Sequence, residues 1–248
     1  MKCLISILFH SFLAITILSS YTQAETIVLD VFDQGTYNSG FGYDSHFPNE
    51  TKAGTGQTTY IRSDNPGAVY RHFHNAFFVF DLTSIIDNVY SANFEIKLHD
   101  YNSRDASESF VIYDVTTPID VLIAGGRHLW DPIGIDLETG TEYGSATIRQ
   151  TDVASIISIQ LSDTAIFDLN SSFGGFFAVG VHSTTSDNPQ PGLYNIDYIS
   201  FGEQGDGVQQ LVLETTPVPE PSTVLLLSSG LVGLINFRRK LVRDRWRN

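Results

Sequence analysis

The sequence predicts an all-β protein, an antiparallel β-sandwich that is jelly-roll-like, with an N-terminal signal helix and a C-terminal transmembrane helix. Alternation of apolar and polar side chains dominates residues 25–216, and helical periodicity is scarce there. Gly, Asn, Asp, Ser and Pro fill the gaps between short apolar runs, as in turn-rich β-proteins. Both ends of the 248-residue chain carry apolar segments instead.

The clearest strand is residues 92–98, where Ala92, Phe94, Ile96 and Leu98 alternate with polar side chains. Similar runs predict seven further strands, at residues 26–31, 58–62, 76–80, 109–115, 156–161, 176–182 and 209–214. The large apolar side chains of these strands form the expected core: Phe77, Val79, Phe94, Ile96, Phe110, Ile112, Phe177 and Val179. Where two large apolar residues are adjacent in a strand, either side chain can be the one that faces the core. A short helix is expected at residues 163–169, with Asp163 as its cap.

Residues 1–24 have the layout of a secretory signal. Lys2 precedes an apolar stretch that ends in small and polar residues, with Thr22 and Ala24 at the cleavage positions. An N-terminal membrane anchor is the alternative, because the apolar run is about long enough for either role. Cys3 is the only cysteine and leaves with the signal, so the exported body has no disulfide.

Charge is distributed unevenly along the chain. The whole chain has a net charge of −14, but residues 25–216, which we call the body, hold 26 acidic and 7 basic residues, a net −19. Such an acidic body argues against nucleic-acid binding. Six of the other seven basic residues lie in residues 217–248.

Three parts follow one another in residues 217–248. A proline-rich linker, residues 217–222, precedes an apolar segment at 223–237 and a basic tail that begins with Arg238, Arg239 and Lys240. Fifteen residues make a helix of roughly 22 Å, and flanking Arg and Lys side chains extend its reach into a bilayer. We expect a transmembrane helix with the basic tail in the cytoplasm. A buried core helix is the alternative, although six cations directly after it make that unfavourable.

This arrangement resembles the PEP-CTERM sorting signal, also called the ice-binding protein C-terminal motif, over residues 217–243. The residues that carry the resemblance are Val218, Pro219, Glu220, Pro221 and Ser222. The resemblance implies a bacterial precursor anchored in the inner membrane, which an exosortase cleaves at the Pro-Glu-Pro site. The body would then reach the cell surface or extracellular matrix, often alongside exopolysaccharide. Export further implies the Sec translocon and a signal peptidase as partners.

Two runs in the body, residues 76–85 and 89–96, resemble the Phe-Asp-Leu-Ser turn and following strand of DNRLRE-type exported β-sandwich domains of unknown function. The resemblance supports the fold and implies no catalytic residue.

Two groups of side chains are candidate metal ligands. Asp100, Asn102, Asp105 and Glu108 cluster oxygen atoms in a Ser-rich segment, which suits calcium. Their spacing is not that of an EF-hand, so a solvated turn is the alternative. His72 and His74 share one face of a strand but lack a third ligand nearby in sequence.

Aromatic residues suggest a glycan-binding surface. Tyr37, Phe41 and Tyr43 alternate with small polar residues, and Trp130 is the only Trp of the body. A loop that folds its aromatics over the end of the sandwich is the alternative. Catalytic motifs such as Gly-x-Ser-x-Gly and His-Glu-x-x-His are absent, and carboxylate pairs arise by chance among 26 acids. We therefore expect a structural or polysaccharide-interaction role without catalysis; the alternative is a carbohydrate-active enzyme, a glycoside hydrolase or lyase.

The charge of the body leads to a test with calcium. Like charges oppose compaction, and divalent cations relieve that repulsion. We expect millimolar calcium at fixed ionic strength to raise the melting temperature. An unchanged melting temperature would contradict this expectation.

Overall fold

The structure is a computed structural model of the chain that describes residues 25–39, 53–61, 69–125, 130–185, 195–202, 208–216 and 230–231. Contacts divide the chain into two compact units. One unit is residues 24–216, and the other combines residues 1–23 with 217–248. The account below concerns the first unit.

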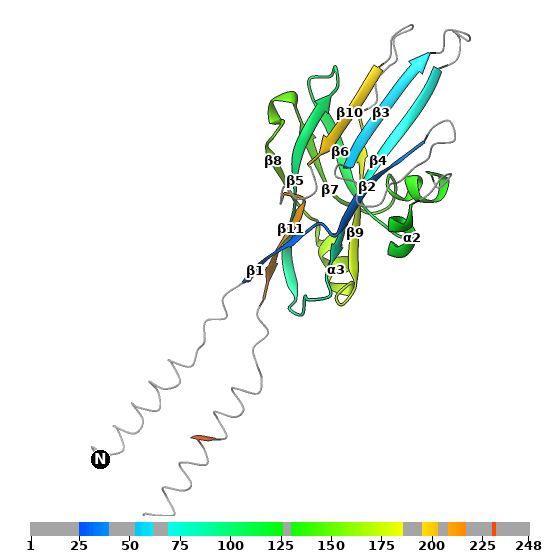
Figure 1. Cartoon of the computed structure of the whole chain (residues 1–248). Coiled ribbons are helices and arrows are strands. Elements are labelled where there is room, and N and C mark those ends of the chain that lie inside the picture. Colours follow the sequence, from blue (N-terminus) through cyan, green and yellow to red (C-terminus); the bar gives the residue numbers. More distant parts are fainter. Residues whose placement is uncertain are drawn as a thin grey trace, which may run out of the picture. The chain divides into compact units, whose positions relative to one another are not determined.

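The described residues of the body form eleven strands (Figure 1). In chain order they are β1 Glu25–Asp30, β2 Asp33–Asn38, β3 Ala53–Ile61, β4 Val69–Asp81, β5 Val89–Asn102, β6 Glu108–Asp114, β7 Glu142–Ile148, β8 Ile156–Gln160, β9 Phe176–Ser183, β10 Asn195–Phe201 and β11 Gln210–Thr215. All ten recorded strand pairings are antiparallel. The prediction of an antiparallel all-β body is confirmed.

The described strands join in one hydrogen-bonded sheet in the order β1-β11-β5-β10-β3-β4-β9-β6-β7, while β2 also pairs with β4 and β8 with β5. The sheet curls, so that β7, the last strand of this order, approaches β8, which pairs with β5 near the beginning of the order. There Ser162 N donates to Tyr143 O at 2.8 Å. Gly144 permits this approach, since a Cβ at this position would lie 3.1 Å from Ile159 Cγ2.

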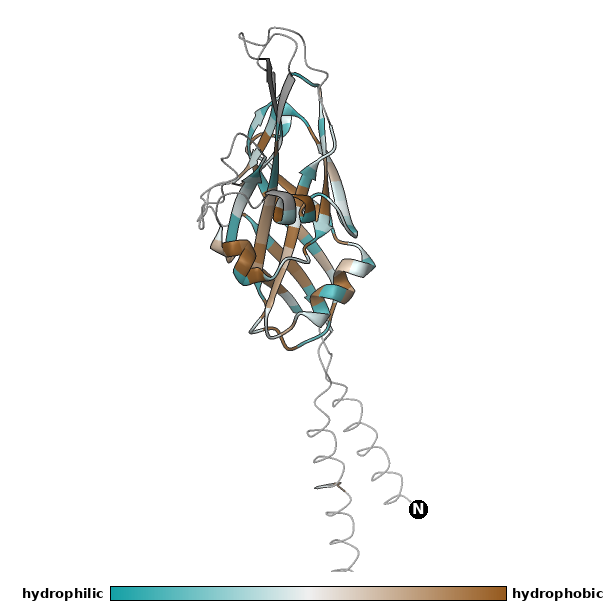
Figure 2. Cartoon of the chain, turned by 90° about the vertical axis from the view of Figure 1, so that its right-hand side faces the viewer, coloured by the Kyte–Doolittle hydropathy of each residue, from teal (hydrophilic) through white to brown (hydrophobic). Residues whose placement is uncertain are grey.

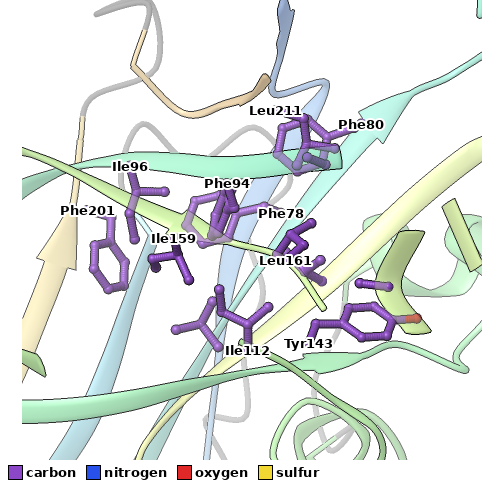
Figure 3. Packing of buried hydrophobic residues seen from close by; sticks show 14 of the residues in the cluster. Phe78, Phe80, Phe94, Ile96, Ile112, Tyr143, Ile159, Leu161, Phe201 and Leu211 are labelled. Atoms are coloured by element: carbon purple, nitrogen blue, oxygen red, sulfur yellow. The ribbon is translucent and has the colours of Figure 1, made fainter. Parts of the chain in front are cut away.

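The main core fills the inside of the curl. Phe78, Phe94 and Phe201 are fully buried and pack edge to face, with ring centroids 5.1 and 6.1 Å from Phe78 (Figure 3). Apolar positions alternate with polar ones along many of the strands (Figure 2). Each large apolar side chain buried in this way contributes roughly 1.5–3 kcal/mol to folding.

A second apolar cluster lies on the outer face of β4. Phe77 and Val79 point outward and are fully buried, whereas Phe78 and Phe80 point into the main core. The outer cluster is covered by the short helix α2, Ile119–Ala124, and by the residues that follow η1, Trp130–Gly134. All eight predicted core residues are buried, but two of them belong to this outer cluster.

The predicted helix exists as α3, Asp163–Ser171, and it packs Ala165 and Leu169 into the main core. Its cap is Ser162, whose Oγ accepts a hydrogen bond from Ala165 N, so the assignment of the cap to Asp163 was wrong. Asp163 lies in the first turn, where its charge favours the positive end of the helix dipole. A three-residue 3-10 helix, η2 Gln150–Asp152, precedes β8.

A β-bulge interrupts β5 near its end. Leu98 pairs with Phe201 and Asp100 with Ser200, so His99 is the extra residue. The bulge reverses the alternation, because Leu98 and Tyr101 are both buried while Asp100 and Asn102 are exposed.

Candidate functional site

An open pocket of about 290 Å³ lies where β6, β7 and β9 meet α3. Its lining combines carboxylates, hydroxyls and aromatic rings, among them Asp114, Thr117, Tyr143, Asp168, Ser172 and Phe176. Among the residues that the structure describes, no Lys or Arg lines this pocket. The pocket therefore suits a neutral or positively charged ligand better than an anion.

Tyr143 forms the floor of the pocket. It is 3% exposed, and its ring stacks on Phe177 with centroids 5.8 Å apart (Figure 3 shows Tyr143 among the buried side chains). The hydroxyl donates to Asp168 Oδ2 at 2.7 Å. Burial and this hydrogen bond raise the pKa of Tyr143, so the phenol remains a donor at neutral pH.

Asp114 is held at the end of β6 by the backbone. Thr141 N donates to Asp114 Oδ1 at 2.6 Å. Gly140, at φ +125°, is required beside it, because a Cβ there would lie 2.1 Å from the same oxygen. Asp114 therefore has a fixed orientation at the rim of the pocket.

Asp136 fixes the segment that leads from β6 to α2. It accepts hydrogen bonds from the backbone N–H and the hydroxyl group of both Thr116 and Thr117. Four hydrogen bonds to Asp136 therefore hold Thr116 and Thr117, and with them this wall of the pocket, in place.

Two exposed aromatic rings adjoin the pocket. Phe176 is 36% exposed, Phe32 is 47% exposed, and their ring centroids lie 4.9 Å apart. Apolar ring faces beside carboxylates and hydroxyls are the surface that sugar rings, with apolar faces and polar edges, contact. The alternation in residues 176–182 predicted a strand here, but no sequence signal paired Phe176 with Phe32.

The structure corrects part of the predicted glycan-binding surface. Tyr37 is fully buried in the outer cluster against Phe77, where its hydroxyl donates to Leu122 O at 2.8 Å. Burial, and to a lesser degree Asp33, raises the pKa of Tyr37 to about 12. Tyr37 cannot offer its ring to a sugar, because residues 33–38 form a strand under α2 instead of an open loop. Phe41, Tyr43 and the side chain of Trp130 lie outside the described residues.

The four proposed calcium ligands differ in exposure. The bulge at His99 turns Asp100 and Asn102 to the solvent, and Asp105 is also exposed. Glu108 points inward and accepts a hydrogen bond from Ser103 Oγ at 2.5 Å. Within the described part of the body, no three His, Cys, Asp or Glu side chains form a group that could hold a metal.

His72 and His74 lie on one face of β4, as expected. Among the described residues they belong to no group of three His, Cys, Asp or Glu side chains that could hold a metal. The His74 ring packs edge-on against Tyr198 with centroids 5.2 Å apart. Burial, and secondarily His72, lowers the pKa of His74 to about 4. His74 is therefore neutral in the folded protein at pH 7.

A further polar cluster on the outer face was not predicted. Asn75 is fully buried on β4 and donates to Gly134 O at 2.8 Å and to Glu138 Oε2 at 3.0 Å. Its Oδ1 lies 2.9 Å from His182 Nδ1. Burial lowers the pKa of His182, and Glu138 partly offsets that effect. This network ties η1 and the residues after it to the sheet.

The predicted sorting segment has its own sequence evidence. Residues 217–240 match the PEP-CTERM protein-sorting motif. This confirms the resemblance for those residues and identifies the chain as an exported protein whose membrane-anchored precursor is processed by an exosortase. The predicted transmembrane helix at 223–237 lies outside the described residues except for Gly230 and Leu231. No helix among the described residues is long and apolar enough to cross a membrane.

Other comparisons add little. No curated protein matches this chain in sequence. A CocE/NonD family hydrolase from Staphylococcus aureus is similar in structure, with a TM-score of 0.33 and 13% identity. The match covers 78% of this chain and 37% of the hydrolase chain. A TM-score this low supports no argument about fold or activity.

His74 predicts a pH-dependent loss of stability. Its folded pKa of about 4 is below the ordinary histidine value of 6.5, so its stabilising contribution is complete above pH 6.5 and is lost as the pH falls toward 4. Between these limits we expect the free energy of unfolding to fall more steeply in the wild type than in His74→Gln. The difference should be no more than about 3 kcal/mol.

Chemical denaturation of both proteins at several pH values measures this difference. The carboxylates titrate in both proteins, so their contribution cancels in the comparison. Curves that remain parallel between pH 7 and 4 would show that burial of His74 does not govern acid stability.

Proposed function

We propose that the body is a polysaccharide-binding module of the cell envelope or extracellular matrix, delivered there by its sorting signal. In this proposal the curled sheet is a jelly-roll-like sandwich related to the DNRLRE-type exported domains, and it acts by binding without catalysis. The observation that carries the proposal is the Phe32–Phe176 ring pair beside a pocket with several polar side chains.

The charge of the body favours certain polymers. With 26 acidic and 7 basic residues, the body repels uronate-rich or sulfated chains. Asp114 and Asp168 bring two of these acids to the pocket itself. Neutral glycans and glycans with amino groups are therefore the ligand class that we propose.

A second candidate function rests on the same two carboxylates. Glycoside hydrolysis needs two acidic side chains across one sugar, and Asp114 and Asp168 line one pocket. The alternative proposal is therefore a glycoside hydrolase or lyase that uses this pair.

Binding to defined oligosaccharides tests the proposal. We expect the purified chain in detergent to bind a hexamer of glucose or glucosamine but not of galacturonic acid. Phe176→Ala should weaken binding about five- to ten-fold, because it removes one ring of the pair. Tyr90→Ala is the matched control, since Tyr90 is 53% exposed and does not line the pocket.

Three results would change this conclusion. No binding of any hexamer would refute the proposal. Equal losses of affinity in Phe176→Ala and Tyr90→Ala would show that the binding site lies elsewhere. Release of reducing ends that disappears in Asp168→Asn would establish the enzyme instead.

The sorting proposal has a separate test. Glu220→Ala should leave an uncleaved precursor in the inner membrane, because it removes the acid of the Pro-Glu-Pro site. Asp244→Ala, which changes the only other acid of residues 217–248, should be processed normally. Immunoblotting of membrane and extracellular fractions distinguishes the two; normal processing of Glu220→Ala would contradict the assigned cleavage signal.

A further inference from the structure

Two large apolar side chains are strongly exposed on the body. Ile86 is 85% exposed and Phe167 is 70% exposed, the highest values among the exposed large hydrophobic residues of the described chain. The pocket described above includes neither of them.

Hydrogen bonds join the two elements that carry these side chains. Ile86 lies in the connection between β4 and β5, and Phe167 lies on α3, which Figure 1 labels. The Asn170 side chain accepts from Val89 N at 2.9 Å and donates to Val89 O at 2.8 Å. The helix and the connection are thus joined directly.

The polypeptide leaves the body beside this connection. Thr216 N donates to Asn88 O at 3.0 Å, two residues from Ile86. Thr215 pairs with Glu25, so the first strand of the body begins beside the end of the last strand.

Chain length limits how far this end can move from the membrane. Only six residues, 217–222, separate Thr216 from the apolar segment at 223–237. Fully extended, six residues span about 20 Å. In the membrane-anchored precursor, Thr216 therefore remains within about 20 Å of the start of the apolar segment.

We propose that Ile86 and Phe167 insert into the interfacial layer of the lipid bilayer while the precursor is anchored. Two apolar side chains are too few for stable binding from solution. The tether makes the contact intramolecular, at an effective concentration in the millimolar range. Cleavage in the sorting signal removes the tether, so the same event that frees the chain also ends the lipid contact.

Acidic residues near Ile86 determine which lipid headgroups favour the contact. Asp81 and Asp87 lie in or next to the same connection, and no basic residue occurs between residues 81 and 91. Anionic lipid therefore repels this end of the body. We expect a stronger contact with phosphatidylcholine than with phosphatidylglycerol.

Site-specific fluorescence tests the contact in the full chain. Cys3→Ser removes the only cysteine, and Ser84→Cys then adds one exposed thiol in the Ile86 connection. A nitrobenzoxadiazole dye at this thiol should be quenched by nitroxide-labelled lipid after reconstitution into phosphatidylcholine vesicles. The same dye at Asn102→Cys is the control, because Asn102 lies about 40 Å away along β5.

Added charges then test the two side chains. Ile86→Asp combined with Phe167→Asp should reduce quenching at residue 84 at least two-fold, whereas Ile135→Asp, at another exposed apolar position, should not. Melting temperatures should be unchanged, because the substituted side chains are exposed. Equal quenching at residues 84 and 102, or quenching at 84 that the double variant retains, would overturn the proposal. Quenching that requires an added exosortase would also overturn it, in favour of a protein partner.

Discussion

The whole body depends on burying β4 on both of its faces. Every side chain from residue 75 to residue 80 is fully buried, with even positions in the main core and odd positions outside it. An inner core alone would leave Phe77 and Val79 in water, so a second layer is obligatory. The chain supplies that layer with α2, η1 and the first residues after it, and the buried amide of Asn75 ties η1 to the sheet. The apolar outer face of β4 is thus covered by a layer that the polar side chain of Asn75 attaches to the sheet.

The pocket arises where this outer cover ends and α3 begins. Strand ends there present Asp114, Tyr143 and Phe176, while α3, which closes the main core with Leu169, turns Asp168 toward them. The same short helix exposes Phe167. One nine-residue helix therefore contributes to the stability of the core, to the polar lining of the pocket and to the apolar end of the body.

Sequence periodicity predicted the strands whose two faces differ in polarity, such as β5, and it predicted α3. It missed β2, β7 and β10. The six mostly polar residues of β2, Asp33–Asn38, give no apolar alternation, although Tyr37 and its neighbours are buried beside β4. It grouped Asp100 and Asn102 with Glu108 as ligands, because no local sequence pattern predicts the bulge at His99. Asp100 and Asn102 are exposed, whereas Glu108 is buried. The aromatic pair beside the pocket joins residues 32 and 176, which no periodicity relates. In contrast, the sorting signal is read from local sequence, and a single sequence was sufficient to find it.

The pairing of β1 with β11 determines when the body is able to fold. Residues 25–30 meet residues 210–215, and the Thr26 hydroxyl donates to Glu214 across 188 positions of sequence. The first strand to be exported consequently has no partner until the last strand of the body has crossed the membrane. This outermost pairing of the sheet therefore forms only after nearly the whole body has been exported. The sheet is therefore complete only when Thr215, two residues before the sorting motif begins at residue 217, is available to pair with Glu25.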